Sequence, residues 1–166
     1  MDIQYLAGAS FKLKGKTATI LTNASSFKVE VEKQIKMEIS EPGEYEIGGI
    51  SIIGMQLGGN KVFVFEIDGL RVLYLGDFSE GITDEKVSQL GSIDVVIINV
   101  GESFKESVKV IGGIDPYFVL PFTQKEPVET FLAESGMTVE KMDKFSLKRE
   151  DILEDQGTKT ILLPQK

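Results

Sequence analysis

The chain contains no histidine and no cysteine in 166 residues. Without cysteine it can form neither disulfides nor thiolate metal sites, and it has no cysteine nucleophile. Without histidine it lacks the imidazoles that zinc enzymes use as ligands, and also the base of a Ser-His-Asp triad. The protein therefore lacks the residues of the commonest hydrolytic active sites.

Long apolar runs and a basic surface are also missing. The longest apolar runs, such as 95–98, are far too short to span a bilayer, and the chain does not open like a signal peptide. There are 18 Lys+Arg against 26 Asp+Glu, a net charge of −8 that repels nucleic-acid phosphates and anionic lipid. We therefore expect a cytoplasmic protein that binds neither nucleic acid nor membrane.

Signals for nucleotide binding and for several domains are absent as well. No Gly-x-Gly-x-x-Gly follows a strand, and no Gly-x-x-x-x-Gly-Lys-Ser/Thr occurs. No repeat, low-complexity stretch or long linker interrupts the sequence. The length and texture predict a single domain spanning 1–166.

The first half of the chain reads as strands separated by short glycine-bearing turns. Asp68-Gly69 stands between two apolar runs, 61–67 and 70–75, and is the strongest two-residue hairpin signal in the sequence. The stretches 27–31 and 35–39 alternate apolar and charged residues. They predict a hairpin that buries one face and shows Lys28, Glu30, Lys36 and Glu38 to water.

After residue 76 helices and strands alternate. The pattern predicts helices at 83–90, 104–110 and 123–135, and strands at 94–100, 117–121 and 158–163. Two strands, 62–65 and 95–98, are apolar at every position, so both of their faces must be covered. A meander followed by strand–helix alternation predicts an α/β (α+β) domain with mixed sheets.

Five stretches of the chain resemble the metallo-β-lactamase fold, in particular its small cytoplasmic branch of zinc-dependent hydrolases. They are IQYLAGASF at 3–11, PGEYEIGGI at 42–50, FEIDGLRVLYLGD at 65–77, LGSIDVVIINVG at 90–101 and FVLPF at 118–122, in the family's order. The resemblance implies an αββα sandwich of two mixed or antiparallel sheets, here truncated in the first half.

The same resemblance implies that the metal chemistry has been lost. Asp77 falls on the family's bridging-aspartate position, whereas Gly8 and Thr123 stand where the branch has histidines. The His-x-His-x-Asp-His loop is missing, because the chain runs through the 27–39 hairpin where that loop would lie. We therefore expect no zinc cofactor, and only a vestigial pocket comprising Gly8, Asp77, Glu80, Glu102 and Thr123.

These residues also have ordinary structural explanations. A carboxylate after Gly76 accepts backbone N–H bonds and stabilises its turn, as Asp77 would. Thr123 and Glu126 have the spacing of a helix capping box. Alternatively, Asp77, Glu80 and Glu102 could hold a hard ion such as manganese or magnesium, as in a divalent-metal-dependent hydrolase.

Loss of the His-x-His-x-Asp-His loop and of every histidine from an intact sandwich pattern predicts a binding or assembly module without hydrolase activity. The hairpin at 27–39 offers an exposed strand edge, so the expected partner is a second copy, as a homodimer, or another protein. A third possible function is a retained pocket that binds a small molecule without turnover.

Overall fold

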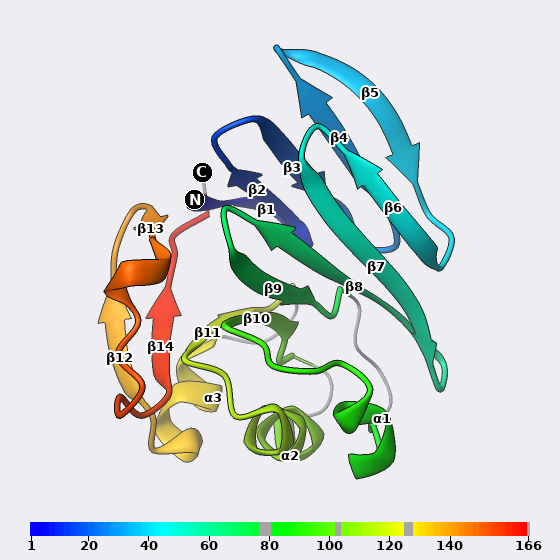
Figure 1. The fold of residues 1–166 in the computed structure, drawn as a ribbon. Coiled ribbons are helices and arrows are strands. Elements are labelled where there is room, and N and C mark those ends of the chain that lie inside the picture. The colour runs from blue at the N-terminus through cyan, green and yellow to red at the C-terminus, as the bar shows by residue number, and fades with distance from the viewer. Residues whose placement is uncertain (77–80, 102–103, 125–127, 166) are drawn as a thin grey trace.

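Two β-sheets face each other in the computed structural model, which describes residues 1–76, 81–101, 104–124 and 128–165 (Figure 1). Sheet A comprises, in spatial order, β13 (Phe145–Ser146), β1 (Asp2–Ala7), β2 (Ser10–Lys14), β3 (Ala18–Thr22), β4 (Phe27–Val31) and β5 (Gln34–Ile39). Sheet B comprises β12 (Thr138–Lys141), β14 (Lys159–Leu162), β11 (Phe118–Phe122), β10 (Val95–Asn99), β9 (Leu70–Tyr74), β8 (Asn60–Ile67), β7 (Ile50–Leu57) and β6 (Gly43–Ile47).

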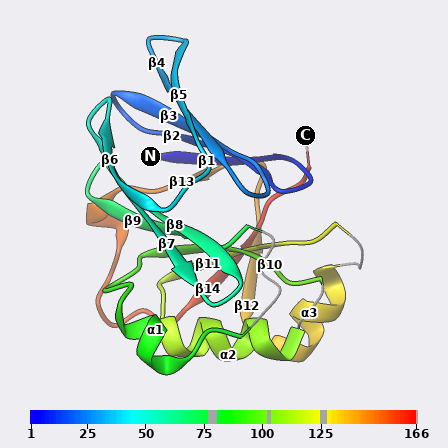
Figure 2. The same ribbon diagram turned by 90° about the vertical axis from the view of Figure 1, so that its right-hand side faces the viewer.

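Sheet B has an antiparallel half and a parallel half. Strands β6 to β9 form an antiparallel meander, whereas β9, β10, β11, β14 and β12 pair in parallel. The helices α1 (Asp84–Ser88), α2 (Phe104–Ile114) and α3 (Val128–Ser135) lie on the face of sheet B that points away from sheet A (Figure 2). A short 3-10 helix, η1 (Arg149–Asp151), precedes β14. No helix in the described ranges is long and apolar enough to cross a membrane.

Two hydrophobic clusters explain why the central strands of sheet B are apolar throughout. Phe63, Phe65 and Ile97 belong to the cluster between the two sheets, whereas Val64 and Ile98 belong to the cluster beneath the helices. Successive side chains of a strand point to opposite faces, so a strand covered on both sides buries every residue. The predicted double coverage of 62–65 and 95–98 is confirmed, since all eight side chains are buried.

Sheet A has no helical layer of its own. Residues 1–76, all of them described, form strands and turns only. The two facing sheets of the predicted sandwich are present, but α1, α2 and α3 cover sheet B alone (Figure 2). The outer face of sheet A is therefore without a helix in the described structure, as the truncated first half of the chain implies.

The hairpin predicted at 27–39 is present, but its alternation is broken. Val29 pairs with Met37 while Glu30 pairs with Ile35, so Lys36 is an extra residue in β5. A bulge of one residue moves the following side chain to the other face. Ile35 therefore shares the outer face with Glu30 and is 59% exposed, which corrects the expectation that it is buried. Met37 keeps the inner face but is 45% exposed.

Several hairpin turns use the left-handed region of the backbone, and two of them place residues other than glycine there. Asp68 and Gly69 have φ of 53° and 76°, as the Asp-Gly signal predicts for a two-residue turn. The β4–β5 turn does the same with Glu32 and Lys33, at φ of 52° and 62°. Residues with a Cβ are strained in this region. The β4–β5 turn has two such residues and the Asp68-Gly69 turn has one, so the β4–β5 turn is the less favourable of the two.

The elements after residue 76 follow the predicted order with shifted ends. The helix expected at 104–110 continues through Gly112 and Gly113 to Ile114, whereas the helix expected at 83–90 covers only Asp84–Ser88. The third helix is described over Val128–Ser135 and ends before Gly136, whose φ is +64°. Strands β12 and β13 were not predicted.

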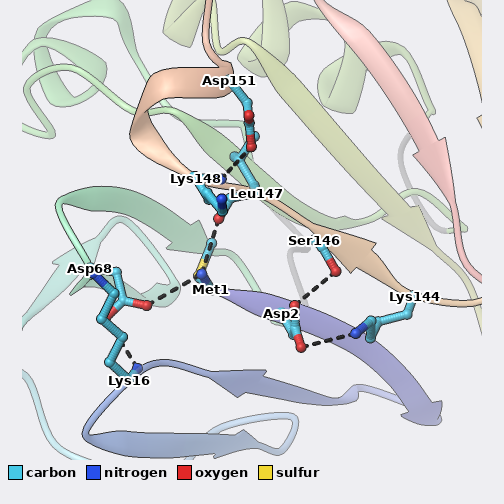
Figure 3. Close-up of polar contacts among 9 residues, drawn as sticks. All are labelled: Met1, Asp2, Lys16, Asp68, Lys144, Ser146, Leu147, Lys148 and Asp151. Carbon is cyan, nitrogen blue, oxygen red and sulfur yellow. Dashed lines mark hydrogen bonds and ion pairs between the residues drawn. The ribbon is translucent and has the colours of Figure 1, made fainter.

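Polar contacts around Met1 hold sheet A, sheet B and the segment after β12 together (Figure 3). The Met1 ammonium donates to Leu147 O at 3.0 Å and pairs with Asp68 at 3.3 Å, while Asp68 accepts the Lys16 N–H at 3.2 Å. Asp2 accepts bonds from the Ser146 hydroxyl and the Lys144 ammonium, which lower the pKa of its carboxyl. The Asp68 turn of sheet B is thereby fixed to a turn of sheet A.

Candidate functional site

The candidate site lies where the parallel strands β9, β10 and β11 end. Because these strands run in the same direction, their carboxyl ends meet at one edge of sheet B. Within two residues of these strand ends the described structure has Gly76, Gly101 and Thr123. Three predicted site residues, Asp77, Glu80 and Glu102, lie outside the described residues.

Tyr74 connects this edge to two loops of sheet A. Its hydroxyl lies 2.6 Å from Ala9 O and 2.8 Å from Asn23 O, and its side chain is buried. The Thr22 hydroxyl donates to the same Ala9 carbonyl at 3.2 Å and accepts the Phe11 N–H at 2.9 Å. The one hydroxyl hydrogen of Tyr74 is shared between the two carbonyls, so this side chain links the end of β9 to both loops of sheet A.

The turn after β3 packs directly against the strand that leads to Asp77. A Cβ built on Gly76 would lie 2.5 Å from Ala24 O, and Gly76 has φ of +55°. Only glycine permits both this backbone conformation and this close approach. The turn at 23–26 therefore occupies the space beside the end of β9.

Gly8 and Thr123 are linked across the sandwich by aromatic side chains. The Tyr5 hydroxyl donates to Gly8 O at 2.9 Å, and burial raises the pKa of Tyr5, which favours the neutral donor. Tyr5 stacks on Phe11 with centroids 4.8 Å apart, and Phe11 meets Phe122 edge-on at 5.2 Å. Phe122 directly precedes Thr123, so the structure brings both predicted positions to the same end of the sandwich.

Thr123 lies against the backbone that follows β10. A Cβ on Gly101 would collide with the Thr123 hydroxyl, and the Gly101 N–H donates to Asn99 Oδ1 at 3.0 Å. The predicted capping box stays a prediction, since its second member, Glu126, is outside the described residues. These contacts give Thr123 a packing role between the ends of β10 and β11.

The donors at this edge do not fit zinc. Zinc sites take three or four ligands from imidazoles, thiolates and carboxylates, and the whole chain has no histidine or cysteine. Residues 1–76, 81–101, 104–124 and 128–165 contain no group of three acids that could hold a metal ion. The groups that the structure places at the described strand ends are hydroxyls, amides and backbone carbonyls, with one carboxylate, that of Glu106, near Gly81.

Two residues near the site were not predicted from the sequence. Tyr74 is one, since its partners are backbone carbonyls 65 and 51 positions away. The other is Glu106, whose Oε2 lies 2.5 Å from the position of a Cβ on Gly81, the first described residue after 77–80. The first-turn position of Glu106 in α2 was the only signal available for it.

An antiparallel sheet that faces a mixed sheet, with helices outside the mixed sheet, defines a metallo-β-lactamase-like sandwich, as predicted. The beta-lactamase superfamily domain matches residues 27–123 of the chain, which is more than half of it. The chain belongs to the beta-lactamase superfamily.

Solved structures show the same fold. An inferred Zn-dependent hydrolase of the metallo-beta-lactamase superfamily from Thermotoga maritima matches with a TM-score of 0.76 and 23% identity, over 98% of this chain and 99% of that one. An inferred metal-dependent hydrolase from Parabacteroides distasonis matches with a TM-score of 0.50 and 11% identity, over 98% and 100%. No curated protein matches the chain.

Proposed function

We propose that this chain is a metal-free, cytoplasmic member of the superfamily that acts as a binding or assembly module without hydrolase activity. The observation that carries the proposal is the complete lack of histidine and cysteine in a sandwich whose two cores are intact. A zinc hydrolase needs the ligands, whereas a binding module needs only the scaffold.

The packing of the site edge supports the same conclusion. The Ala24 carbonyl lies against Gly76, and Tyr74 fixes the neighbouring loops through Ala9 and Asn23. These contacts stabilise the sandwich at this edge with backbone and hydroxyl groups alone. The edge therefore needs no metal ion to hold its loops together.

The surface best suited to binding is the β4–β5 hairpin. In the described part of the chain the exposed large apolar side chains are Ile35, Met37 and Leu153, and two of these three lie on β5. Apolar side chains exposed along an open strand are typical of a contact surface. We infer that a protein chain, either a second copy or another protein, covers this strand.

A hydrolase that uses a hard divalent ion, manganese or magnesium, is the alternative. Glu106 favours it, because this carboxylate lies beside Gly81, next to the segment that contains Asp77 and Glu80. Oxygen ligands of this kind suit magnesium and manganese better than zinc.

Metal content separates the two functions. Protein purified without chelator should contain no stoichiometric metal by elemental analysis. Its melting temperature should be the same in EDTA and in manganese, because a ligand that binds only the folded state would raise it. Bound metal that is lost in Asp77→Asn and Glu106→Gln, but retained in the matched surface variant Glu44→Gln, would replace the proposal with the hydrolase.

A further inference from the structure

Strand β5 is an open edge that carries both apolar and charged side chains. It ends sheet A in the spatial order of the strands, and five of its six residues are exposed. The β4–β5 hairpin extends beyond the body of the sandwich (Figures 1 and 2). The unpaired N–H and C=O groups of such an edge form a template for another strand.

The charge pattern of β5 is complementary to itself in one antiparallel register. The strand reads Gln-Ile-Lys-Met-Glu-Ile from 34 to 39. A two-fold axis at Met37 places Lys36 opposite Glu38 of a second copy, twice, with Met37 against Met37 at the centre. Opposite charges stabilise such cross-strand pairs and like charges destabilise them.

Neighbouring registers lack this match. An axis at Lys36 sets Lys36 against itself, and an axis at Glu38 sets Glu38 against itself. Axes between residues place Lys36 or Glu38 opposite apolar side chains, so the pairing at Met37 is the one that the charges favour.

The other long open edge, β6, has no such register. Its sequence is Gly-Glu-Tyr-Glu-Ile from 43 to 47, so an antiparallel pair centred on Tyr45 sets Glu44 against Glu46. The hairpin 27–39 carries three Lys and three Glu and is neutral, in a chain of net charge −8. Two copies therefore repel each other least when they approach through this hairpin.

We propose that two copies of this chain associate through antiparallel pairing of their β5 strands about a two-fold axis at Met37. The inference deepens the proposed function, on which it rests, by naming the partner and the surface. The bulge at Lys36 keeps the regular ladder short, so the association is weak and reversible. The opposite edge of sheet A, β13, has two residues, so the pairing closes as a dimer and does not extend into fibres.

Charge reversal tests the register. Sedimentation equilibrium over a concentration series should show a monomer–dimer equilibrium for the natural chain. Lys36→Glu should weaken dimerisation about tenfold, because it replaces two attractions by two repulsions. The double variant Lys36→Glu with Glu38→Lys should restore dimerisation. Lys36 has no ion pair among the described contacts, so the single variant leaves the Lys28–Glu38 pair at 3.5 Å intact.

A single introduced cysteine tests the position of the axis, because the natural chain has none. Residues opposite each other in an antiparallel pair have Cα atoms about 4.5–5.5 Å apart, which a disulfide can span. Met37→Cys should therefore give an oxidised dimer, whereas Glu44→Cys on the open edge β6 should stay monomeric. Circular dichroism of each reduced variant shows that it is folded.

The results overturn the dimer and the proposed function separately. A monomer at every concentration, or equal cross-linking of both cysteine variants, would contradict the β5 dimer. It would leave the metal-free function standing, with another protein's strand as the occupant of this edge. Stoichiometric metal in a protein that still dimerises through β5 would overturn only the proposed function.

Discussion

At the scale of single residues, the described site edge is organised by contacts with backbone carbonyls. Tyr74 directs its hydroxyl to Ala9 O and Asn23 O, and Gly76 admits the Ala24 carbonyl at the end of the same strand. Replacing Tyr74 by phenylalanine removes a hydrogen-bond donor, and replacing Gly76 by alanine strains the backbone. These two residues therefore contribute to the local stability at the end of β9.

Tyr74→Phe tests this directly. Removing the hydroxyl takes away the one donor that the Ala9 and Asn23 carbonyls share, although Thr22 still donates to Ala9 O, and should lower the free energy of unfolding by about 1 kcal/mol. Urea denaturation measures the change. Tyr45→Phe is the matched control, because the Tyr45 hydroxyl donates to Glu41 O at an exposed position and water can replace it. Equal losses in the two variants would show that Tyr74 has no special role.

At the scale of elements, the β4–β5 hairpin shows where a sequence pattern succeeds and where it fails. The alternation correctly predicts two paired strands, and charge at Lys28 and Glu38 on the outer face. It fails at Ile35, because counting in twos assumes a regular register and the bulge at Lys36 breaks it. The alternation therefore could not predict that an apolar side chain is exposed on this edge.

Elements with a local sequence signal were predicted, whereas elements that depend on distant pairing were not. Asp68-Gly69 and the strands apolar at every position were predicted because turn chemistry and double coverage leave a local signature. Strands β12 and β13 were missed because they are short, and β13 exists through its pairing with β1, over 140 residues away. Gly8 and Thr123 became candidates through the family resemblance, whereas the partners of Tyr74 depend on tertiary contacts that leave no local pattern in the sequence.

The β4–β5 turn offers a prediction at this scale. Glu32 and Lys33 hold left-handed conformations that Asn and Gly adopt with much less strain, so the double variant Glu32→Asn with Lys33→Gly should stabilise the hairpin by about 1 kcal/mol. Hydrogen exchange at the amides of β4 and β5 should slow accordingly. The turn at Asp68-Gly69 already has the preferred chemistry, and Asp68→Asn there should bring no comparable gain. Faster exchange in the double variant would contradict the assigned turn.

At the scale of the whole molecule, the two sheets are connected at both ends of strand β9. Tyr74 bonds to sheet A loops at one end, and Asp68, just before the strand, bonds to Lys16 and Met1 at the other (Figure 3). Between these ends lies the shared aromatic cluster of the inter-sheet core. The segment that follows β12 in sheet B then enters sheet A as β13. Neither sheet can lose its structure without exposing the inner face of the other.

This arrangement predicts that the chain unfolds in one cooperative step. Far-ultraviolet circular dichroism, which reports both sheets, and tyrosine fluorescence, to which buried Tyr74 contributes, should give coincident transitions in urea. Phe145 belongs to β13 of sheet A, and its ring packs on Phe118 of sheet B with the ring centroids 4.9 Å apart. Phe145→Ala should therefore shift both transitions together and lower the free energy of unfolding by about 3–5 kcal/mol. Because we propose that two copies associate, the measurement is made at several protein concentrations and compared at the lowest. Transitions that separate in the natural chain, or a Phe145→Ala variant in which only one signal moves, would mean that the two sheets are independent folding units.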